Sequence, residues 1–319
     1  MLSKESTDLL REIKVAFDEV PRIGSVRDSM GLVSISELKK EEWYDEYYVV
    51  PTRCERLYHE RIQYDMEFPF VVNMYGKSRE DIKKYIKYEE LFAAWVYIIS
   101  HEPCIKKLTL HWLLYDVPKR GRMNNRETVI PHMVNTGYTY RCKSDNTITL
   151  FRIEDAYKVF VHETIHSFGY DVWLLGSSNV MELRYGSYVV DAYEVCCELF
   201  ARFVAIANER DPEKTLRANI KWGLSQASRF LGEEEFRDIL LQGRTREYKE
   251  ETPAFSYYVA TAILLYEYCY GSESKKVGSY YNYIKDVMEK YMRGEKREEW
   301  DNMFLLMDSI TGTMQMLAP

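Results

Sequence analysis

Residues 156–169 read AYKVFVHETIHSFG, and this stretch decides how the chain is expected to fold. Its apolar residues predict a buried helix that ends at Gly169. The helix contains the motif H-E-x-x-H, formed by His162, Glu163 and His166. Two residues four positions apart lie about 40° apart around a helix and one turn along it. Both imidazoles can therefore reach one metal ion.

Glu163 is the candidate catalytic base. It follows His162 directly, so its carboxylate can take a proton from a water molecule that a zinc ion has made more acidic. The chain has 6 histidines in 319 residues, and chance would give on the order of 0.01 such motifs. The alternative interpretation is a helix that carries two unrelated histidines.

A second segment, residues 191–203 with the sequence DAYEVCCELFARF, supplies the candidate third ligand. It is predicted to be a helix on which Glu194 and Glu198 share one face. Glu194 lies 28 residues after His166, and a glutamate on a second helix commonly completes a zinc site with an open fourth position. The alternative is an exposed acidic face of a helix, which the apolar neighbours of the two glutamates disfavour.

Asp171 is a competing third ligand, and it requires the chain to turn sharply after Gly169. A third histidine at position 172 would indicate the metzincin class of zinc proteases, but this position holds Val172. The other histidines have no partner at metal-ligand spacing, so we expect them on the surface or hydrogen-bonded in the core. They are His59, His101, His111 and His132.

The two motifs together, H-E-x-x-H followed by E-x-x-x-E-x-F, resemble those of gluzincin metallopeptidases. The resemblance covers roughly residues 108–208 and implies a zincin-like fold, a Zn²⁺ cofactor and hydrolysis of peptide bonds. It implies that Glu194 is the zinc ligand and that Glu198 orients a ligand histidine or the helix. Cys197 stands where that family often has alanine. A weaker resemblance, centred on residues 148–163, is to uncharacterised zincin-like proteins encoded by large DNA viruses.

The gluzincin resemblance also implies a hydrogen-bond donor for the oxyanion of the tetrahedral intermediate, commonly a tyrosine or a histidine. Tyr185 is the candidate, because it stands in a Tyr-Gly pair nine residues before Glu194. Tyr188, Tyr257 and Tyr258 compete with it. A tyrosine that only packs is the alternative for each of them.

The spacing of apolar residues predicts a helix-rich α+β fold. We expect residues 1–77 to form a helical N-terminal region and residues 78–319 to form a zincin-like domain, with a small sheet beside the H-E-x-x-H helix and a helical C-terminal lobe. Three short strands are predicted at residues 108–114, 134–140 and 147–151. Helices are predicted at residues 9–17, 78–98, 155–168, 189–208, 216–230, 255–270 and 279–292. Ser78 followed by Asp81 predicts a capped start for the second of these helices.

The composition is that of a globular protein, with 46% hydrophobic and 29% charged residues and a net charge of −7. An acidic chain is a poor partner for nucleic acid. Acidic residues near the first methionine argue against a secretory signal, and a run of 18 apolar residues is missing, which argues against membrane insertion. We therefore expect a soluble intracellular protein, either cytoplasmic or associated with a virion.

The six cysteines have no spacing typical of a zinc ribbon, so we expect reduced, buried thiols. They are Cys54, Cys104, Cys142, Cys196, Cys197 and Cys269. Tyrosine is unusually frequent, with 27 residues. Its amphipathic ring suits contact surfaces as well as cores, which predicts protein partners that bind a tyrosine-rich surface.

These observations favour a zinc-dependent peptidase that cuts a peptide or protein substrate. His162, His166 and Glu194 are the expected ligands, Glu163 is the expected base and Tyr185 is the expected oxyanion donor. The alternative is a structural or assembly protein, such as a virion component, that keeps a zincin-like fold without turnover. Glu163 favours catalysis, because a purely structural zinc site gains nothing from that residue.

Overall fold

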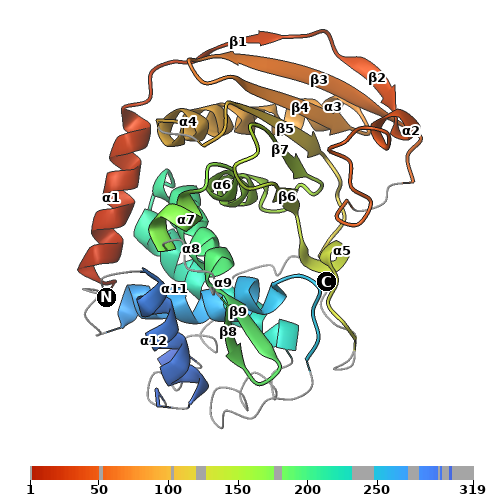
Figure 1. Ribbon diagram of the computed structural model, residues 1–319. Coiled ribbons are helices and arrows are strands. Elements are labelled where there is room, and N and C mark those ends of the chain that lie inside the picture. The colour runs from red at the N-terminus through yellow and green to blue at the C-terminus, as the bar shows by residue number, and fades with distance from the viewer. Residues whose placement is uncertain are drawn as a thin grey trace. The chain divides into compact units, whose positions relative to one another are not determined.

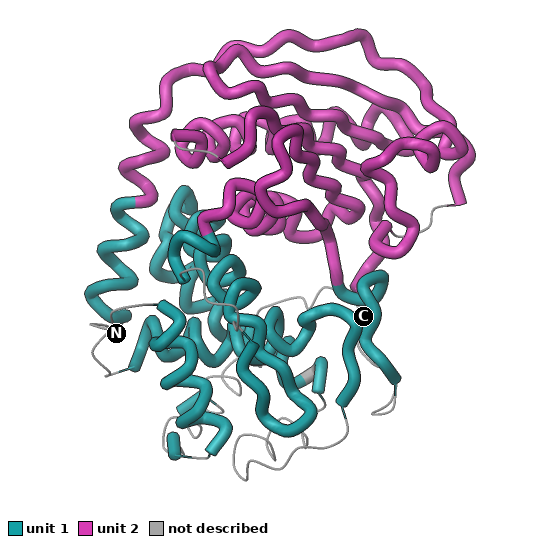
Figure 2. Tube along the Cα trace, in the orientation of Figure 1, with its two compact units in different colours: residues 1–12, 120–134, 171–319 teal, residues 13–119, 135–170 magenta. Residues whose placement is uncertain are grey.

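The computed structural model divides the chain into two compact units, each described here by itself (Figures 1 and 2). Unit 1 comprises residues 1–12, 120–134 and 171–319, and unit 2 comprises residues 13–119 and 135–170. Neither unit follows a boundary at residue 77. The residues that the structure describes are 2–49, 53–101, 104–119, 127–175, 182–231, 248–271, 280–293, 295–296 and 302–303.

Unit 2 is built on a seven-stranded mixed sheet with the order β1-β3-β4-β5-β7-β6, and β2 also pairs with β3. The central strands β4, β5 and β7 run parallel to one another, and the outer pairs are antiparallel. The strands are β1 (Gly24–Arg27), β2 (Gly31–Ser34), β3 (Arg56–Asp65), β4 (Phe70–Gly76), β5 (Lys107–Leu113), β6 (Gly137–Thr139) and β7 (Asp145–Leu150).

One face of this sheet is covered by α3 (Arg79–Tyr85), α4 (Glu89–Ile99) and α6 (Ala156–Ser167) (Figure 1). Alternate residues of the parallel strands point toward these helices. Phe70 of β4 lies 5.9 Å from Phe160 of α6, and Phe92 of α4 lies 5.2 Å from Trp112 of β5, measured between ring centroids. All four side chains are fully buried, so this layer forms the core that positions α6.

The segment 35–49, which begins with α2 (Ile35–Leu38), packs against a second cluster of buried sheet residues that includes Tyr75 and Leu113. Trp43 stacks on His111 at 4.0 Å between ring centroids. Its carbonyl oxygen accepts hydrogen bonds from the hydroxyls of Tyr138 and Thr149. This irregular segment is therefore held to the sheet by both stacking and hydrogen bonds.

The expectation of a helical N-terminal region was wrong for most of residues 1–77. The predicted first helix is present as α1 (Lys4–Asp18), but β1, β2, β3 and β4 follow it. The residues of β3 alternate in burial along part of the strand, yet a charged residue, Glu60, occupies one of the buried positions. Arg27 of β1 lies near the Glu60 carboxylate. Because the two residues are far apart in the sequence, the local pattern gives no sign that Glu60 occupies a buried position of a strand.

The three predicted strands are confirmed as β5, β6 and β7, although they form only part of a larger sheet. The predicted capped helix after Ser78 is also confirmed. The Ser78 hydroxyl accepts a hydrogen bond from the amide of Asp81, and the Asp81 carboxylate accepts one from the amide of Ser78. This capping box satisfies two amides that the first turn leaves open.

Unit 1 is mainly helical, with α11 running through its core. The predicted helix at residues 189–208 is in fact a strand, β9, followed by α8, and β9 pairs with β8 in a hairpin. The helix predicted from Ser279 begins at Tyr280, and Ser279 itself lies outside the described residues. The elements are α5 (Pro131–Val134), α7 (Tyr170–Leu175, whose first residue belongs to unit 2), β8 (Glu182–Tyr185), β9 (Tyr188–Asp191), α8 (Ala192–Ala207), α9 (Pro212–Leu231), the π-helix η2 (Ser256–Ala260), α11 (Thr261–Tyr270) and α12 (Tyr280–Met292).

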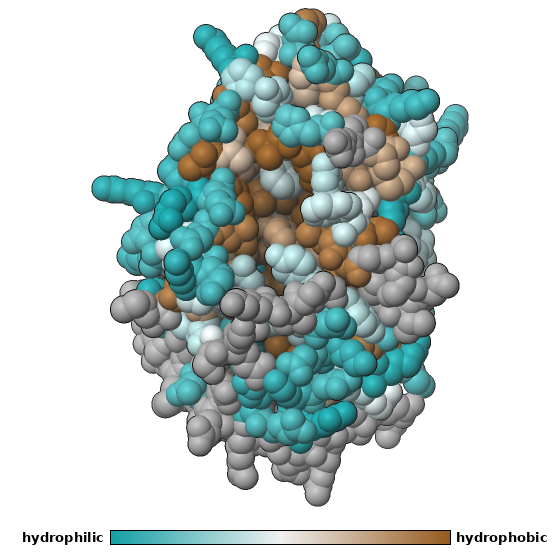
Figure 3. All heavy atoms as spheres, turned by 60° about the vertical axis from the view of Figure 1, so that its left-hand side comes forward, coloured by the Kyte–Doolittle hydropathy of each residue, from teal (hydrophilic) through white to brown (hydrophobic). Residues whose placement is uncertain are grey.

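Among the described helices, none combines the length and the apolar character needed to cross a membrane. Hydrophilic residues make up much of the face shown in Figure 3, and some hydrophobic residues also reach the surface there. Trp173 is the most exposed of the large hydrophobic side chains, at 76%.

Candidate metal centre

The two motif histidines lie on α6, a helix that is buried along most of its length. The ring of Phe160 packs 4.5 Å from that of Phe92 on α4, which fixes one face of the helix. The indole N–H of Trp95 donates a hydrogen bond of 2.6 Å to the hydroxyl of Thr164, which in turn donates to the carbonyl of Val161. Packing and buried hydrogen bonds together set the rotation of α6 about its axis.

His162 and His166 turn toward each other on this helix. Their Nε2 atoms are 3.2 Å apart and their ring centroids are 4.8 Å apart. Two nitrogen ligands, each about 2.05 Å from an ion and this far from each other, subtend an angle of about 103° at the ion, close to the tetrahedral value. The spacing therefore fits two ligands of one zinc ion. A hydrogen bond between the two rings is the other arrangement that this distance allows.

Glu194 lies in the first turn of α8. Asp191 caps this helix, and its Oδ1 accepts hydrogen bonds from the amides of Tyr193 (2.9 Å) and Glu194 (3.3 Å). Glu194 lies in unit 1, whereas His162 and His166 lie in unit 2. The pairing of the two histidines is therefore a feature of unit 2 alone, and the role of Glu194 as third ligand stays a prediction.

Glu198 lies one turn further along α8, and its chemistry differs from that of Glu194. Its Oε2 is 3.6 Å from Nε of Arg202, and both side chains are buried. The guanidinium of Arg202 also lies over the ring of Trp222, 5.6 Å from its centroid. A carboxylate paired in this way helps to hold α8 in place, which agrees with a supporting role rather than a ligand role.

Asp171, the competing ligand, lies on α7 in unit 1, whereas His166 lies on α6 in unit 2. The sharp turn that Asp171 requires is present, because Gly169 has a φ of 73° and α7 begins at the next residue. Asp171 is fully buried. Cys197 is fully buried on α8 and was not predicted as a ligand.

Glu163 is buried, with 7% of its surface exposed, directly after His162. A carboxylate inside the protein is shielded from bulk water, so protons reach it mainly through its immediate neighbours. This placement is compatible with a general base. The role itself stays a prediction.

Tyr185 stands at the end of β8, opposite Tyr188 of β9. Its hydroxyl is buried and finds no hydrogen-bond partner among the described residues. Burial raises the pKa of Tyr185, and the charged side chains that influence this pKa are Glu289 and Arg293 near the end of α12. The phenol is therefore protonated at neutral pH and could donate a hydrogen bond, and its role as oxyanion donor stays a prediction.

The competing tyrosines differ from Tyr185 in their surroundings. Tyr188 is fully buried and packs 4.8 Å from Phe255, which favours a core role. Tyr258 stacks on Phe230 at 5.1 Å. Tyr257 lies with Tyr258 on the π-helix η2, a kind of irregularity that is frequent at functional sites.

Two of the remaining histidines are hydrogen-bonded within the sheet, as expected. A ring nitrogen of His59 lies 3.1 Å from the side-chain oxygen of Asn73, and Nδ1 of His111 lies 3.0 Å from the hydroxyl of Tyr75. Burial lowers the pKa of His111 to about 3, so its ring is uncharged at neutral pH. Neither ring belongs to a group of metal ligands in the described part of the chain.

The expectation of six reduced thiols was wrong for two of them, because Cys104 and Cys142 form a disulfide. Their separation of 38 residues hides the pair in the sequence, and the fold of unit 2 brings the sulfurs together. The other four cysteines are not disulfide-bonded. Cys54 is half-buried, whereas Cys196, Cys197 and Cys269 are buried as expected.

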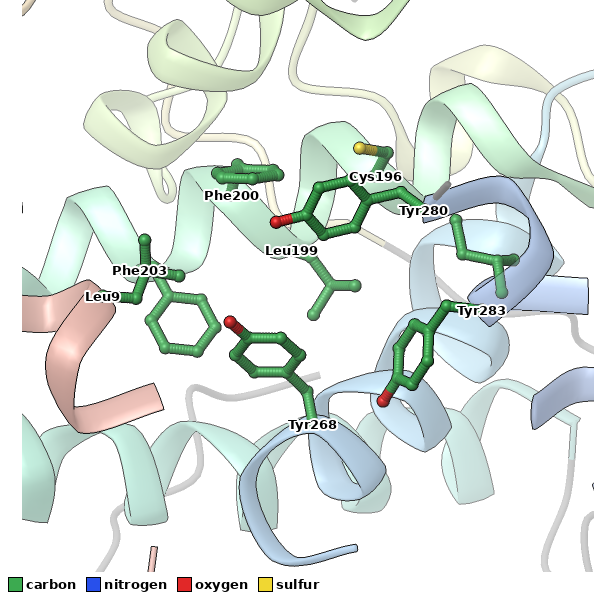
Figure 4. Close-up of a pocket in the computed structure, with 9 residues that line it drawn as sticks. Leu9, Cys196, Leu199, Phe200, Phe203, Tyr268, Tyr280 and Tyr283 are labelled. Atoms are coloured by element: carbon green, nitrogen blue, oxygen red, sulfur yellow. The ribbon is translucent and has the colours of Figure 1, made fainter. Parts of the chain in front are cut away.

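An apolar pocket lies on the other side of α8 (Figure 4). At 100° per residue, its α8 wall faces away from Glu194. The α8 residues lining it are Cys196, Leu199, Phe200 and Phe203, and the remaining lining residues are Leu9, Tyr268, Tyr280, Tyr283 and Ile284. The pocket contains no carboxylate or imidazole, so it is not the candidate reaction site.

Comparisons of the chain with protein-family models, with curated proteins and with solved structures give no match. The assignment of a function therefore depends on the chemistry of the residues themselves.

Proposed function

We propose that this chain is a zinc-dependent peptidase in which His162, His166 and Glu194 hold the metal. The observation that carries the proposal is the pair of buried imidazoles on α6, whose Nε2 atoms are 3.2 Å apart. Glu194, in the first turn of α8, is the third ligand in this proposal, which gives a site with three protein ligands. Such a site leaves a fourth position open, which is typical of catalytic rather than structural zinc.

A zinc ion at these ligands would polarise the scissile carbonyl and make a water molecule more acidic. Glu163 would accept the proton of the attacking water and pass it to the leaving amine. Asp191 and Arg202 act on this chemistry only indirectly, because they cap and brace the helix that carries Glu194.

The test compares metal content and peptide cleavage for the parent protein and three variants. We expect one zinc per chain in the parent and in Glu163→Gln, which keeps the ligands but cannot accept a proton. Hydrolysis by Glu163→Gln should fall by roughly 10² to 10⁴. His166→Ala should lose zinc as well as activity, because it lacks a ligand. His101→Ala, which changes an exposed histidine, is the control and should match the parent.

Two results would contradict the proposal. If Glu163→Gln cut peptides as fast as the parent, the base would be another residue. If the folded parent bound no zinc, the metal centre itself would be refuted.

A second function, as a structural or assembly protein, is favoured by a row of tyrosines beside the edge strand β6. Tyr48 stacks on Tyr138 at 4.8 Å, and Tyr47 and Tyr140 flank this pair at 5.0 and 6.4 Å, between ring centroids. Tyr47 and Tyr140 are each exposed by more than 40%. Exposed aromatic rings of this kind suit a protein interface. A parent protein that binds zinc but cuts no peptide in a broad library would favour this function.

A further inference from the structure

The disulfide between Cys104 and Cys142 lies against the end of α6 that carries His166. The amide of Cys142 donates a hydrogen bond of 3.1 Å to the carbonyl of Ser167, the last residue of α6. The sulfur of Cys104 lies 3.5 Å from the same carbonyl oxygen. The bridge therefore contacts the helix one residue after the second motif histidine.

Gly169 makes room for this bridge. A Cβ atom at Gly169 would lie 2.6 Å from the sulfur of Cys142, which is closer than a carbon can approach, and 3.4 Å from that of Cys104, which is van der Waals contact. Gly169 also has a φ of 73°, which favours glycine. The turn that ends α6 is thus shaped around the two bonded sulfurs.

Two hydrogen bonds join the same end of α6 to neighbouring parts of unit 2. The hydroxyls of Thr139 and Ser167 are 2.7 Å apart, and the hydroxyl of Tyr170 donates to the carbonyl of Ile99 at 2.9 Å. Ile99 is the last residue of α4, and Cys104 follows it after a short connection. The disulfide is therefore the covalent member of a set of contacts that hold residues 166–170.

Both cysteines of the bridge are exposed, whereas the helix that they touch is buried. An exposed disulfide is open to attack by a reductant, and exposed bridges are commonly the labile, regulatory ones. Cys142 also has a φ of 49°, an unusual conformation for a residue other than glycine. Opening the bridge would let this residue relax.

We propose that the Cys104–Cys142 disulfide is a redox-sensitive clamp on the end of α6, and that its reduction loosens residues 166–170 and weakens metal binding by His166. Two thiol sulfurs cannot remain as close as two bonded sulfurs, so the contacts at Gly169 must change on reduction. Reduced Cys104 also gains a proton that it can donate to the Ser167 carbonyl, in competition with the amide of Cys142. The metal-binding part of this inference rests on the proposed function, whereas the loosening of the helix end does not.

The reducing agent for the test is a water-soluble trialkylphosphine, which has no thiol that could itself bind zinc. The sulfur–sulfur bond breaks as it accepts two electrons from phosphorus. One water molecule supplies the oxygen of the phosphine oxide and the two protons of the thiols. A cellular thiol reductant would carry out the same two-electron reduction by exchange.

The first measurement is hydrogen exchange of the metal-free protein, read in peptides that cover residues 163–170. We expect exchange there to become at least about tenfold faster on reduction, because the helix end opens more often. The double variant Cys104→Ser/Cys142→Ser should exchange fast with and without phosphine. Cys54→Ser, which removes a half-buried cysteine outside the bridge, should respond to phosphine as the parent does. Unchanged exchange in the reduced parent would overturn the clamp.

The second measurement is the affinity for Zn²⁺ in competition with a chromophoric chelator. We expect the reduced parent and the double serine variant to bind zinc about tenfold more weakly than the oxidised parent, as is common when the support of a ligand is removed. Equal affinities in the two states would overturn the coupling to the metal. If no form bound zinc, the proposed function would fail, and the exchange result would still decide whether the clamp exists.

Discussion

The buried hydrogen bond between Trp95 and Thr164 should be an energetic support of α6. The indole nitrogen of Trp95 lies 2.6 Å from the Thr164 hydroxyl, and Thr164 is fully buried. Thr164→Val keeps the shape of the side chain but leaves the indole N–H without its acceptor. A buried donor left in this way costs about 1–3 kcal/mol of unfolding free energy.

A double-mutant cycle isolates this interaction from the loss of packing. Trp95→Phe removes the donor, so the double variant with Thr164→Val contains no unpaired group. We expect the two changes together to destabilise the protein by about 1–2 kcal/mol less than the sum of the single changes. Urea unfolding followed by far-ultraviolet circular dichroism measures each term. Thr109→Val, at a half-buried threonine of β5, is the control and should stay within about 0.5 kcal/mol of the parent.

Additive effects in this cycle would refute the reasoning, because they would show that the hydrogen bond contributes nothing beyond each residue's own packing. If the two changes were coupled in the free energy of unfolding but not in the affinity for zinc, the rotation of α6 would not limit metal binding. We expect instead that Thr164→Val also weakens zinc binding, since Thr164 lies between the two histidines in the helix.

Three further outcomes are expected. Phe160→Ala removes a fully buried ring at the contact of α6 with α4 and the sheet, so calorimetry should show a loss of about 3–5 kcal/mol in stability. Gly169→Ala should lower the melting temperature and reduce the free energy of unfolding by more than about 1 kcal/mol, because of the positive φ and the nearby sulfur of Cys142. The control Gly31→Ala should be nearly neutral, since no atom lies within 4 Å of the new Cβ. Similar losses of stability in both variants would contradict the argument. His111 has a folded-state pKa of about 3 and an ordinary pKa of 6.5, so the unfolded chain binds one more proton than the folded protein between these pH values. The stability that the neutral, buried imidazole contributes is therefore lost as the pH falls through this window. The free energy of unfolding of His111→Phe should therefore depend less steeply on pH between pH 6 and pH 4, by up to about 1.4 kcal/mol per pH unit, and equal slopes in urea titrations would rule out a buried neutral imidazole.

The local parts of this structure could be predicted from the sequence, because short-range physics decides them. The capping box at Ser78 and Asp81 depends on residues three apart, and it is present as expected. The H-E-x-x-H helix needs only the period of α6 to bring His162 and His166 onto one face, and the measured Nε2 separation agrees with that geometry. In each case the interacting groups lie within one turn of a helix.

Other features depend on residues far apart in the chain, and only the tertiary structure decided them. In the strand β3, the charged residue Glu60 interrupts the alternation of apolar and polar residues that would predict a strand. Glu60 is buried near Arg27, which stands 33 positions earlier in the sequence. The disulfide joins cysteines 38 residues apart, and neither position carries a local signal of pairing.

The sequence by itself therefore determined the H-E-x-x-H helix, its paired imidazoles and the glutamate helix that follows. The tertiary structure decided which sheet supports the H-E-x-x-H helix and which sulfurs lie against its end. The physical reason is one of range. Backbone hydrogen bonds and side-chain periodicity act over a few residues, whereas burial of a charge or formation of a disulfide depends on the partners that folding of the whole chain brings within contact distance.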